Sequence, residues 1–275
     1  MKKCVNGLMQ ENTVCTEDRT IDPGSPGRPR ARAVCAIVML LFFVLLSRST
    51  VLAQDGRGYF ELSGGYKTGD FGTPTTSNLY YLSPVLGYVA PRYDVSVTMP
   101  YLFLSSGSGG SSMMNMQSGI GDIILRGGVV LVPEGPAGFS VDSSLGVKLP
   151  TADETMGLGT GETDHGAFLA LHQRLDQFKL SLMGGYIKAG DPPQTNYNDV
   201  SLYGVGISRV FGGTNLSASF EGRRALIPGA KNPQEINVGF FHVLTEEYAV
   251  KGGTFVGLND GGPDFGLNLG VVRWF

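Results

Sequence analysis

The sequence predicts an all-β fold: a closed antiparallel up-and-down transmembrane β-barrel of about 12 strands. Three observations predict it. Apolar and polar residues alternate with a period of two along most of the chain after residue 54, as in strands with one apolar face. The segments between these stretches are alternately long and short. Aromatic residues gather near both ends of the expected strands, as they do at membrane interfaces.

Each expected strand is close to the length that a tilted membrane strand needs, which is about 9–11 residues. The alternation is clearest around residues 93–103, where Tyr93, Val95 and Val97 share one face and Asp94, Ser96 and Thr98 share the other. The expected strands cover residues 58–68, 78–90, 92–105, 118–132, 138–149, 164–175, 178–189, 199–211, 215–227, 235–244, 248–258 and 264–275.

The connections between strands distinguish a membrane barrel from a soluble sandwich. The odd-numbered connections are long and polar, for example "TADETMGLGTGET", whereas the even-numbered ones are short, for example "APR" and "DQ". This alternation predicts long extracellular loops at one end and short periplasmic turns at the other. Closure is expected because hydrocarbon offers no partner for the backbone groups of a free sheet edge.

The N-terminal part has the pattern of an export signal. Three arginines precede the unbroken apolar run Ala33–Leu46, and small residues follow it before Gln54. A basic region, a short apolar region and small residues at the cut are typical of a signal peptide. We expect residues 1–53 to be an N-terminal extension and cleaved signal peptide, with the cut at Ala53/Gln54, and residues 54–275 to form a barrel in the outer membrane of a Gram-negative bacterium. An uncleaved N-terminal anchor is the alternative.

Composition narrows the class of protein further. Cys4, Cys15 and Cys35 all precede the expected cut. The presequence holds seven basic and four acidic residues, which leaves 14 basic and 20 acidic ones (21 − 7 and 24 − 4) and a net charge of −6 in the mature part. This balance, without a basic patch, argues against a nucleic-acid partner. No cofactor is expected.

Two candidate chemistries have alternatives. The stretch Val147–Asp164 is interpreted as an outside loop with a hydrated backbone, and a cation site at its clustered carboxylates is the alternative. Catalysis would need a nucleophile, a base and an orienting partner. The sequence offers His165, His172 and His242 without such a constellation, so we expect no enzyme; hydrolysis dependent on His172 is the alternative.

Charged residues on the inward phase of the strands are the main candidates for a site. Asp94, Asp122, Arg126 and Asp142 fall on three successive strands, so they can be neighbours across the sheet. These charges are either paired groups that fill a narrow lumen or a selectivity zone of a pore, with Asp122 and Arg126 as the first candidates. The expected lumen-lining residues are Glu61, Asp94, Asp122, Arg126, Asp142, Lys148, Arg174, Glu221, Arg223 and Lys251.

Residues 118–190 resemble a known family. The matching motifs are the pair Gly121 and Asp122, the strand end Lys148–Thr151 and the loop Gly159–Gly161. They resemble the family of outer-membrane proteins linked to the meta-pathway of phenol degradation. The resemblance implies an exported barrel that takes up hydrophobic or aromatic compounds, and it supplies no catalytic residues.

These observations predict an outer-membrane channel or transporter for passive uptake of small, hydrophobic or aromatic solutes. The alternative is a non-transporting structural or adhesive barrel with surface-binding loops. The expected partners are outer-membrane lipid, a small-molecule solute and the barrel-insertion machinery, which would read the terminal strand that ends in Phe275.

Overall fold

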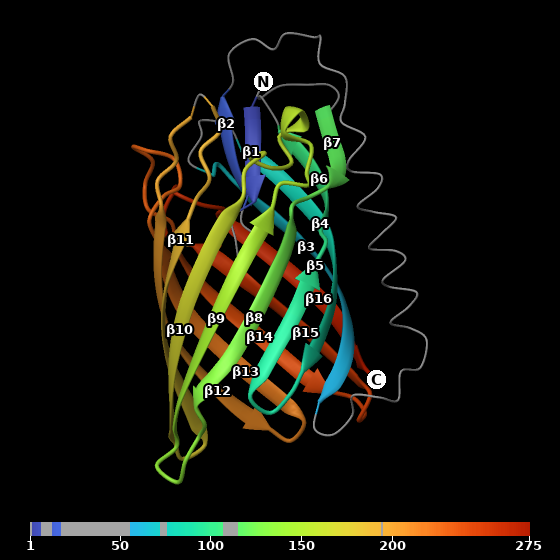
Figure 1. The fold of residues 1–275 in the computed structure, drawn as a ribbon, viewed down its shortest axis with the longest axis vertical. Coiled ribbons are helices and arrows are strands. Elements are labelled where there is room, and N and C mark those ends of the chain that lie inside the picture. The colour runs from blue at the N-terminus through green and yellow to red at the C-terminus, as the bar shows by residue number, and fades with distance from the viewer. Residues whose placement is uncertain (1, 7–12, 18–55, 72–75, 107–114, 194) are drawn as a thin grey trace.

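The computed structural model describes residues 2–6, 13–17, 56–71, 76–106, 115–193 and 195–275. Figure 1 shows a tall barrel of tilted antiparallel strands, with long connections at one end and short turns at the other. The expected signal peptide and its cut at Ala53/Gln54 lie outside the described residues.

The barrel sheet contains 14 strands. They are β3 (Arg57–Gly69), β4 (Ser77–Val89), β5 (Tyr93–Thr98), β6 (Tyr101–Ser106), β7 (Asn115–Ile120), β8 (Ile123–Val132), β9 (Phe139–Leu149), β10 (Asp164–Leu175), β11 (Phe178–Lys188), β12 (Val200–Phe211), β13 (Thr214–Arg223), β14 (Gln234–Val243), β15 (Tyr248–Gly257) and β16 (Phe265–Trp274). Strands β5 and β6 continue one another, as do β7 and β8, so the chain crosses the barrel 12 times, as predicted.

The first and last strands close the barrel. Strand β3 pairs with β4 on one side and with β16 on the other. Beyond the end of β16, Gly58 and Phe275 exchange two backbone hydrogen bonds, of 3.1 and 2.9 Å. Closure satisfies the backbone groups of both terminal strands, as a membrane demands.

Prolines account for the break between β5 and β6. Pro84 in β4 and Pro100 lie at the same level of the barrel, and neither can donate a ladder hydrogen bond. The Met99 N–H donates to the Pro84 carbonyl at 3.1 Å, which keeps the chain against β4 across the gap. The next crossing breaks beside it, at Gly121 and Asp122, so β7 pairs with β6 while β8 pairs with β5 and β9.

The outer face of the barrel is apolar and carries aromatic residues towards both ends. Exposed Val205, Leu267 and Leu269 belong to its aliphatic part. Near the long loops, the rings of Tyr66 and Tyr80 lie 4.8 Å apart between centroids. An apolar band between aromatic girdles suits the hydrocarbon core and its interfaces.

Two short strands precede the barrel. Strands β1 (Lys2–Asn6) and β2 (Thr13–Glu17) pair antiparallel in a separate two-stranded sheet. Both segments lie within residues 1–53, the expected N-terminal extension and signal peptide. Among the described residues, no helix has the length and apolar character needed to cross a membrane.

Candidate functional site: the barrel lumen

A cavity of about 500 Å³ lies inside the barrel. Strand β5 and strands β8 through β13 border it. At the long-loop end it reaches the loops, where Phe71 and Leu226 line it. Pockets for small molecules commonly measure about 300–1,000 Å³. The cavity is therefore large enough for a small solute.

An apolar wall lines one side of this cavity. It is formed by Phe168 of β10, Met183 of β11 and Leu202 of β12. Each of the first two side chains lies against a glycine of the next strand. A Cβ atom on Gly185 would come within 2.4 Å of the Phe168 ring, and one on Gly204 within 2.6 Å of the Met183 methyl carbon. The glycines let both side chains lie close to the wall and leave the interior open.

Charged residues border the same cavity. Asp94, Arg126, Asp142, Glu221 and Arg223 come from β5, β8, β9 and β13 and all lie along it. These are five of the ten expected lumen residues. The cavity thus combines an apolar wall with fixed charges, an arrangement that can orient an amphipathic molecule.

Asp122 does not join this group and belongs instead to a buried ion cluster. Lys148 Nζ lies 2.8 Å from Asp164 Oδ2 and 3.4 Å from Asp122 Oδ2, and it donates to Thr160 Oγ1 at 2.8 Å. All four side chains are buried. Asp122 Oδ1 also accepts the Ala152 N–H at 3.0 Å. The cluster therefore attaches the loop after β9 to three neighbouring strands.

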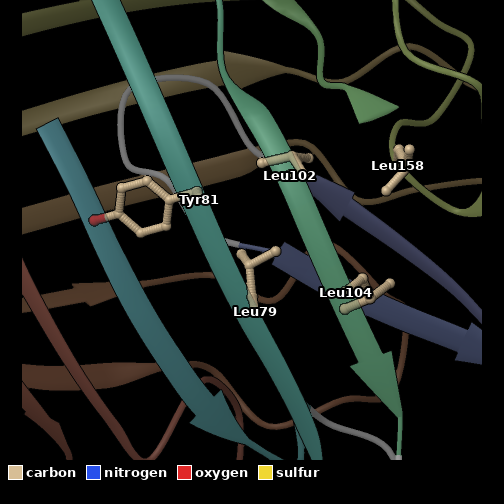
Figure 2. Close-up of a cluster of buried hydrophobic side chains, with 5 residues drawn as sticks. All are labelled: Leu79, Tyr81, Leu102, Leu104 and Leu158. Atoms are coloured by element: carbon tan, nitrogen blue, oxygen red, sulfur yellow. The ribbon is translucent and has the colours of Figure 1, made fainter. Parts of the chain in front are cut away.

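That loop turns into the barrel. Figure 2 shows Leu158 facing the inner side of β4 and β6, where it packs with Leu79, Tyr81, Leu102 and Leu104. Leu158 is only 2% exposed. The burial of a leucine against four apolar side chains holds the loop inside the mouth of the barrel.

Our expectation that this loop lies outside and is hydrated is wrong for its middle part, because residues 157–160 are buried. Two of its carboxylates, those of Asp153 and Asp164, are also engaged within the protein. Asp153 caps the short 3-10 helix η1 (Glu154–Met156) by accepting from two backbone N–H groups, and Asp164 pairs with Lys148. Within the described part of the chain, no group of three metal-ligating side chains is placed to hold a metal ion.

The remaining expected residues form separate ion pairs. Lys251 Nζ lies 2.5 Å from Glu61 Oε1, which joins β15 to β3 across β16. At the short-turn end, Arg174 Nε donates to Glu134 Oε1 at 2.6 Å. Glu134 lies in the turn, and its hydrogen bond with Arg174 lowers its pKa below the ordinary value.

The structure also assembles a Ser–His–Asp contact that the sequence analysis missed. His172 Nδ1 lies 2.8 Å from Ser181 Oγ, and His172 Nε2 lies 3.0 Å from Asp142 Oδ2. The statement that no histidine has such partners is therefore wrong. The register of β10 and β11 could have predicted this contact, because it places His172 directly opposite Ser181. Strand β11 is paired on both sides along this region, so its backbone N–H groups are committed to the ladder and supply no oxyanion hole.

A second, smaller cavity has a different chemistry. It measures about 310 Å³ and is bordered by uncharged polar side chains of β13 to β16, together with Lys251. The polar side chains are Asn215, Ser217, Ser219, Asn237, Thr254 and Asn268. The barrel interior therefore carries polar side chains beside Phe241 and Phe255 along β13 to β16, and it is largely apolar where β10 to β12 form the wall.

Solved structures share this architecture. An outer membrane channel from Pseudomonas putida F1 is similar with a TM-score of 0.64 and 16% identity, covering 83% of this chain and all of that one. The NanC porin has a TM-score of 0.54 and 9% identity over 78% of this chain and 98% of its own. The transport unit of the autotransporter AIDA-I from Escherichia coli has a TM-score of 0.50 and 13% identity over 91% and 100%. At these identities the likeness shows the fold alone.

No curated protein matches the chain in sequence. A family model does: residues 60–207, more than half of the chain, match the family described as "Putative MetA-pathway of phenol degradation". The matched region contains the Gly121–Asp122 break, the cluster around Lys148 and the inward loop. The chain has a porin-like β-barrel fold and belongs to this phenol-degradation family.

Proposed function

We propose that this protein is a passive channel for the uptake of small hydrophobic or aromatic solutes across the outer membrane of a Gram-negative bacterium. The observation that carries the proposal is the cavity of about 500 Å³ with its wall of Phe168, Met183 and Leu202. The family's link to phenol degradation supports a solute of this kind.

The apolar wall suits passage better than retention. A solute that buries roughly 100 Å² of apolar surface against it gains only about 2.5 kcal/mol. Such an interaction concentrates an aromatic solute at the wall and still permits rapid release. A passive route needs no more than this, because solute then moves down its own gradient.

The ten charged residues named from the sequence would line or support this route. The pairs Lys251–Glu61 and Arg174–Glu134 hold long side chains in fixed positions. Asp94, Arg126 and Asp142 border the cavity and would form its selectivity zone. The Lys148 cluster would act indirectly, by holding the inward loop and so setting the width of the mouth.

The terminal residue would serve assembly. Phe275 is 55% exposed and directly follows β16, the strand that closes the barrel. We propose that the insertion machinery reads this end, that the mature chain begins after Ala53, and that the exposed belt contacts lipid.

Entry of labelled benzyl alcohol into outer-membrane vesicles tests the channel. Vesicles that carry the protein should equilibrate faster than vesicles without it, and should not accumulate solute above the external concentration. Leu202→Trp, which fills the cavity, should slow entry, whereas Val205→Trp on the exposed side of the same strand should not. Equal rates with and without the protein would refute the proposal and leave the structural or adhesive barrel, for which binding through the long loops is the readout.

A further inference from the structure

Arg126 stands apart among the cations that border the cavity. Arg224 donates to Asn198 Oδ1 at 2.9 Å, and Arg223 lies beside the carboxylates of Glu221 and Glu235. Arg126 is exposed on β8, and in the part of the chain that the structure describes it makes neither a hydrogen bond nor an ion pair. Its guanidinium group therefore has donors available to a solute.

The carboxylates along the cavity are mostly committed elsewhere. Asp142 pairs with His172 at 3.0 Å, and Asp164 pairs with Lys148 at 2.8 Å. Glu221 accepts a hydrogen bond from Ser219 Oγ at 3.1 Å. Asp94 remains. It shares the cavity with Arg126 but forms no ion pair with it among the described residues. Asp94 is thus the acidic group that would compete with an anionic solute for Arg126.

The wall between Arg126 and Phe168 is lined by small residues. Arg126 lies opposite Gly146 of β9, and Gly146 lies opposite Gly166 of β10. In the next inward row, Ser144 lies opposite Phe168. Strands β8 and β10 are separated by two strand spacings, about 10 Å. Because no large side chain intervenes along these rows, a small molecule can reach the guanidinium and the ring together.

We propose that the cavity selects amphipathic monoanions: small carboxylates whose carboxyl group engages Arg126 while an aromatic or short alkyl body lies against Phe168, Met183 and Leu202. This inference rests on the proposed channel function and specifies its solute class. A guanidinium fork matches a carboxylate in shape and in charge. The apolar wall supplies the second contact, which a simple inorganic anion cannot make.

Benzoate and acetate separate this mechanism from sieving. A lumen that only sieves passes the smaller acetate faster, whereas the proposed site favours benzoate. The measurement is the zero-current potential of the full-length protein in planar bilayers under gradients of sodium benzoate and of sodium acetate. The expected result is a benzoate permeability above that of acetate.

Three variants assign the effect to its residues. Arg126→Gln should lower the benzoate permeability at least about tenfold, as expected when a hydrogen-bonded charge is lost. Asp94→Asn should raise it, because the competing carboxylate is gone. Arg273→Gln is the matched control, since Arg273 is exposed, lies 5.7 Å from the centroid of the Tyr248 ring and does not border the cavity, and it should leave the permeability ratio unchanged.

The outcomes separate the two proposals. If acetate passes at least as fast as benzoate, or if Arg126→Gln leaves the ratio unchanged, the anion site is wrong although the channel stands. If the wild-type protein conducts neither anion and does not speed the entry of benzyl alcohol, the channel itself is wrong, and this inference falls with it.

Discussion

Removal of the charge on Lys148 should be one of the most damaging single changes in the barrel. The side chain is fully buried, with its ammonium group 2.8 Å from Asp164 and 3.4 Å from Asp122. Lys148→Met keeps a long apolar stem and deletes the charge. Two buried carboxylates then face each other without a cation.

The size of the effect follows from burial. Breaking a buried ion pair by removing one partner costs about 3–5 kcal/mol, because the remaining charge is left without compensation. Lys251→Met is the matched control. Its pair with Glu61 is partly exposed to the lumen, at 35% for the lysine, so its loss should cost no more than about 1 kcal/mol.

Urea unfolding of the purified barrel in detergent, followed by heat-modifiable mobility on gels, measures both variants. The combined variant Lys148→Met, Asp122→Asn and Asp164→Asn should recover much of the lost stability, since it carries no uncompensated charge. If Lys148→Met unfolds within about 1 kcal/mol of the Lys251→Met control, the reasoning from buried charge is refuted.

Three further predictions follow from other parts of the barrel. Leu158→Ala should destabilise the inward loop by about 2–5 kcal/mol and raise single-channel conductance; unchanged conductance would show that the loop does not narrow the mouth. Burial, and to a lesser extent the nearby carboxylates of Asp70 and Asp260, raise the pKa of Asp264 above its ordinary value, so the folded barrel holds this proton more tightly than the unfolded chain does. Its contribution to stability should be present below the ordinary carboxyl pKa and be lost as pH rises through the raised one, and Asp264→Asn should flatten that slope in urea midpoints measured from acidic to neutral pH. Deletion of Phe275 removes two backbone hydrogen bonds that close the barrel and should reduce the fraction of heat-modifiable, inserted protein in isolated outer membranes; an unchanged fraction would contradict its role in insertion.

The strands were predictable because one face of each carries apolar side chains that lie exposed on the outside of the barrel. Alternation with period two is a local property, and it placed the strand at 164–175 with the same bounds as β10. The end of β13 was predicted four residues late, at 227. The strand stops at Arg223 because the chain then turns, with the Ala225 N–H donating to Asn232 Oδ1 at 2.9 Å.

The two broken crossings depend on contacts between strands, which local patterns do not report. Pro84 and Pro100 disrupt the ladder because the register sets them at one level. The inward loop shows the same limit. Its composition is that of a hydrated loop, and Leu158 is its one large aliphatic residue after Met156. The apolar surface that receives Leu158 is formed by β4 and β6, far away in sequence.

Individual site contacts were the hardest to predict. The alternation along a strand identifies which side chains share a face of the sheet, but it does not identify which of them are in contact. Asp122 was grouped with Asp94 and Arg126 by phase, whereas the strand break places it beside Lys148. The contact between His172 and Ser181 likewise requires the exact register of β10 and β11.

The most direct test of the account asks whether solute passes through the cavity at all. Met183→Cys places a thiol on the apolar wall, and Val205→Cys places one on the exposed side of the next strand. Benzyl alcohol entry into outer-membrane vesicles is measured before and after treatment with a bulky methanethiosulfonate, which forms a disulfide with the cysteine and releases methanesulfinate, with mass spectrometry confirming modification. The account predicts that modification at position 183 blocks entry and that reduction restores it, while modification at position 205 has no effect. Undiminished entry with position 183 fully modified would contradict passage through this lumen.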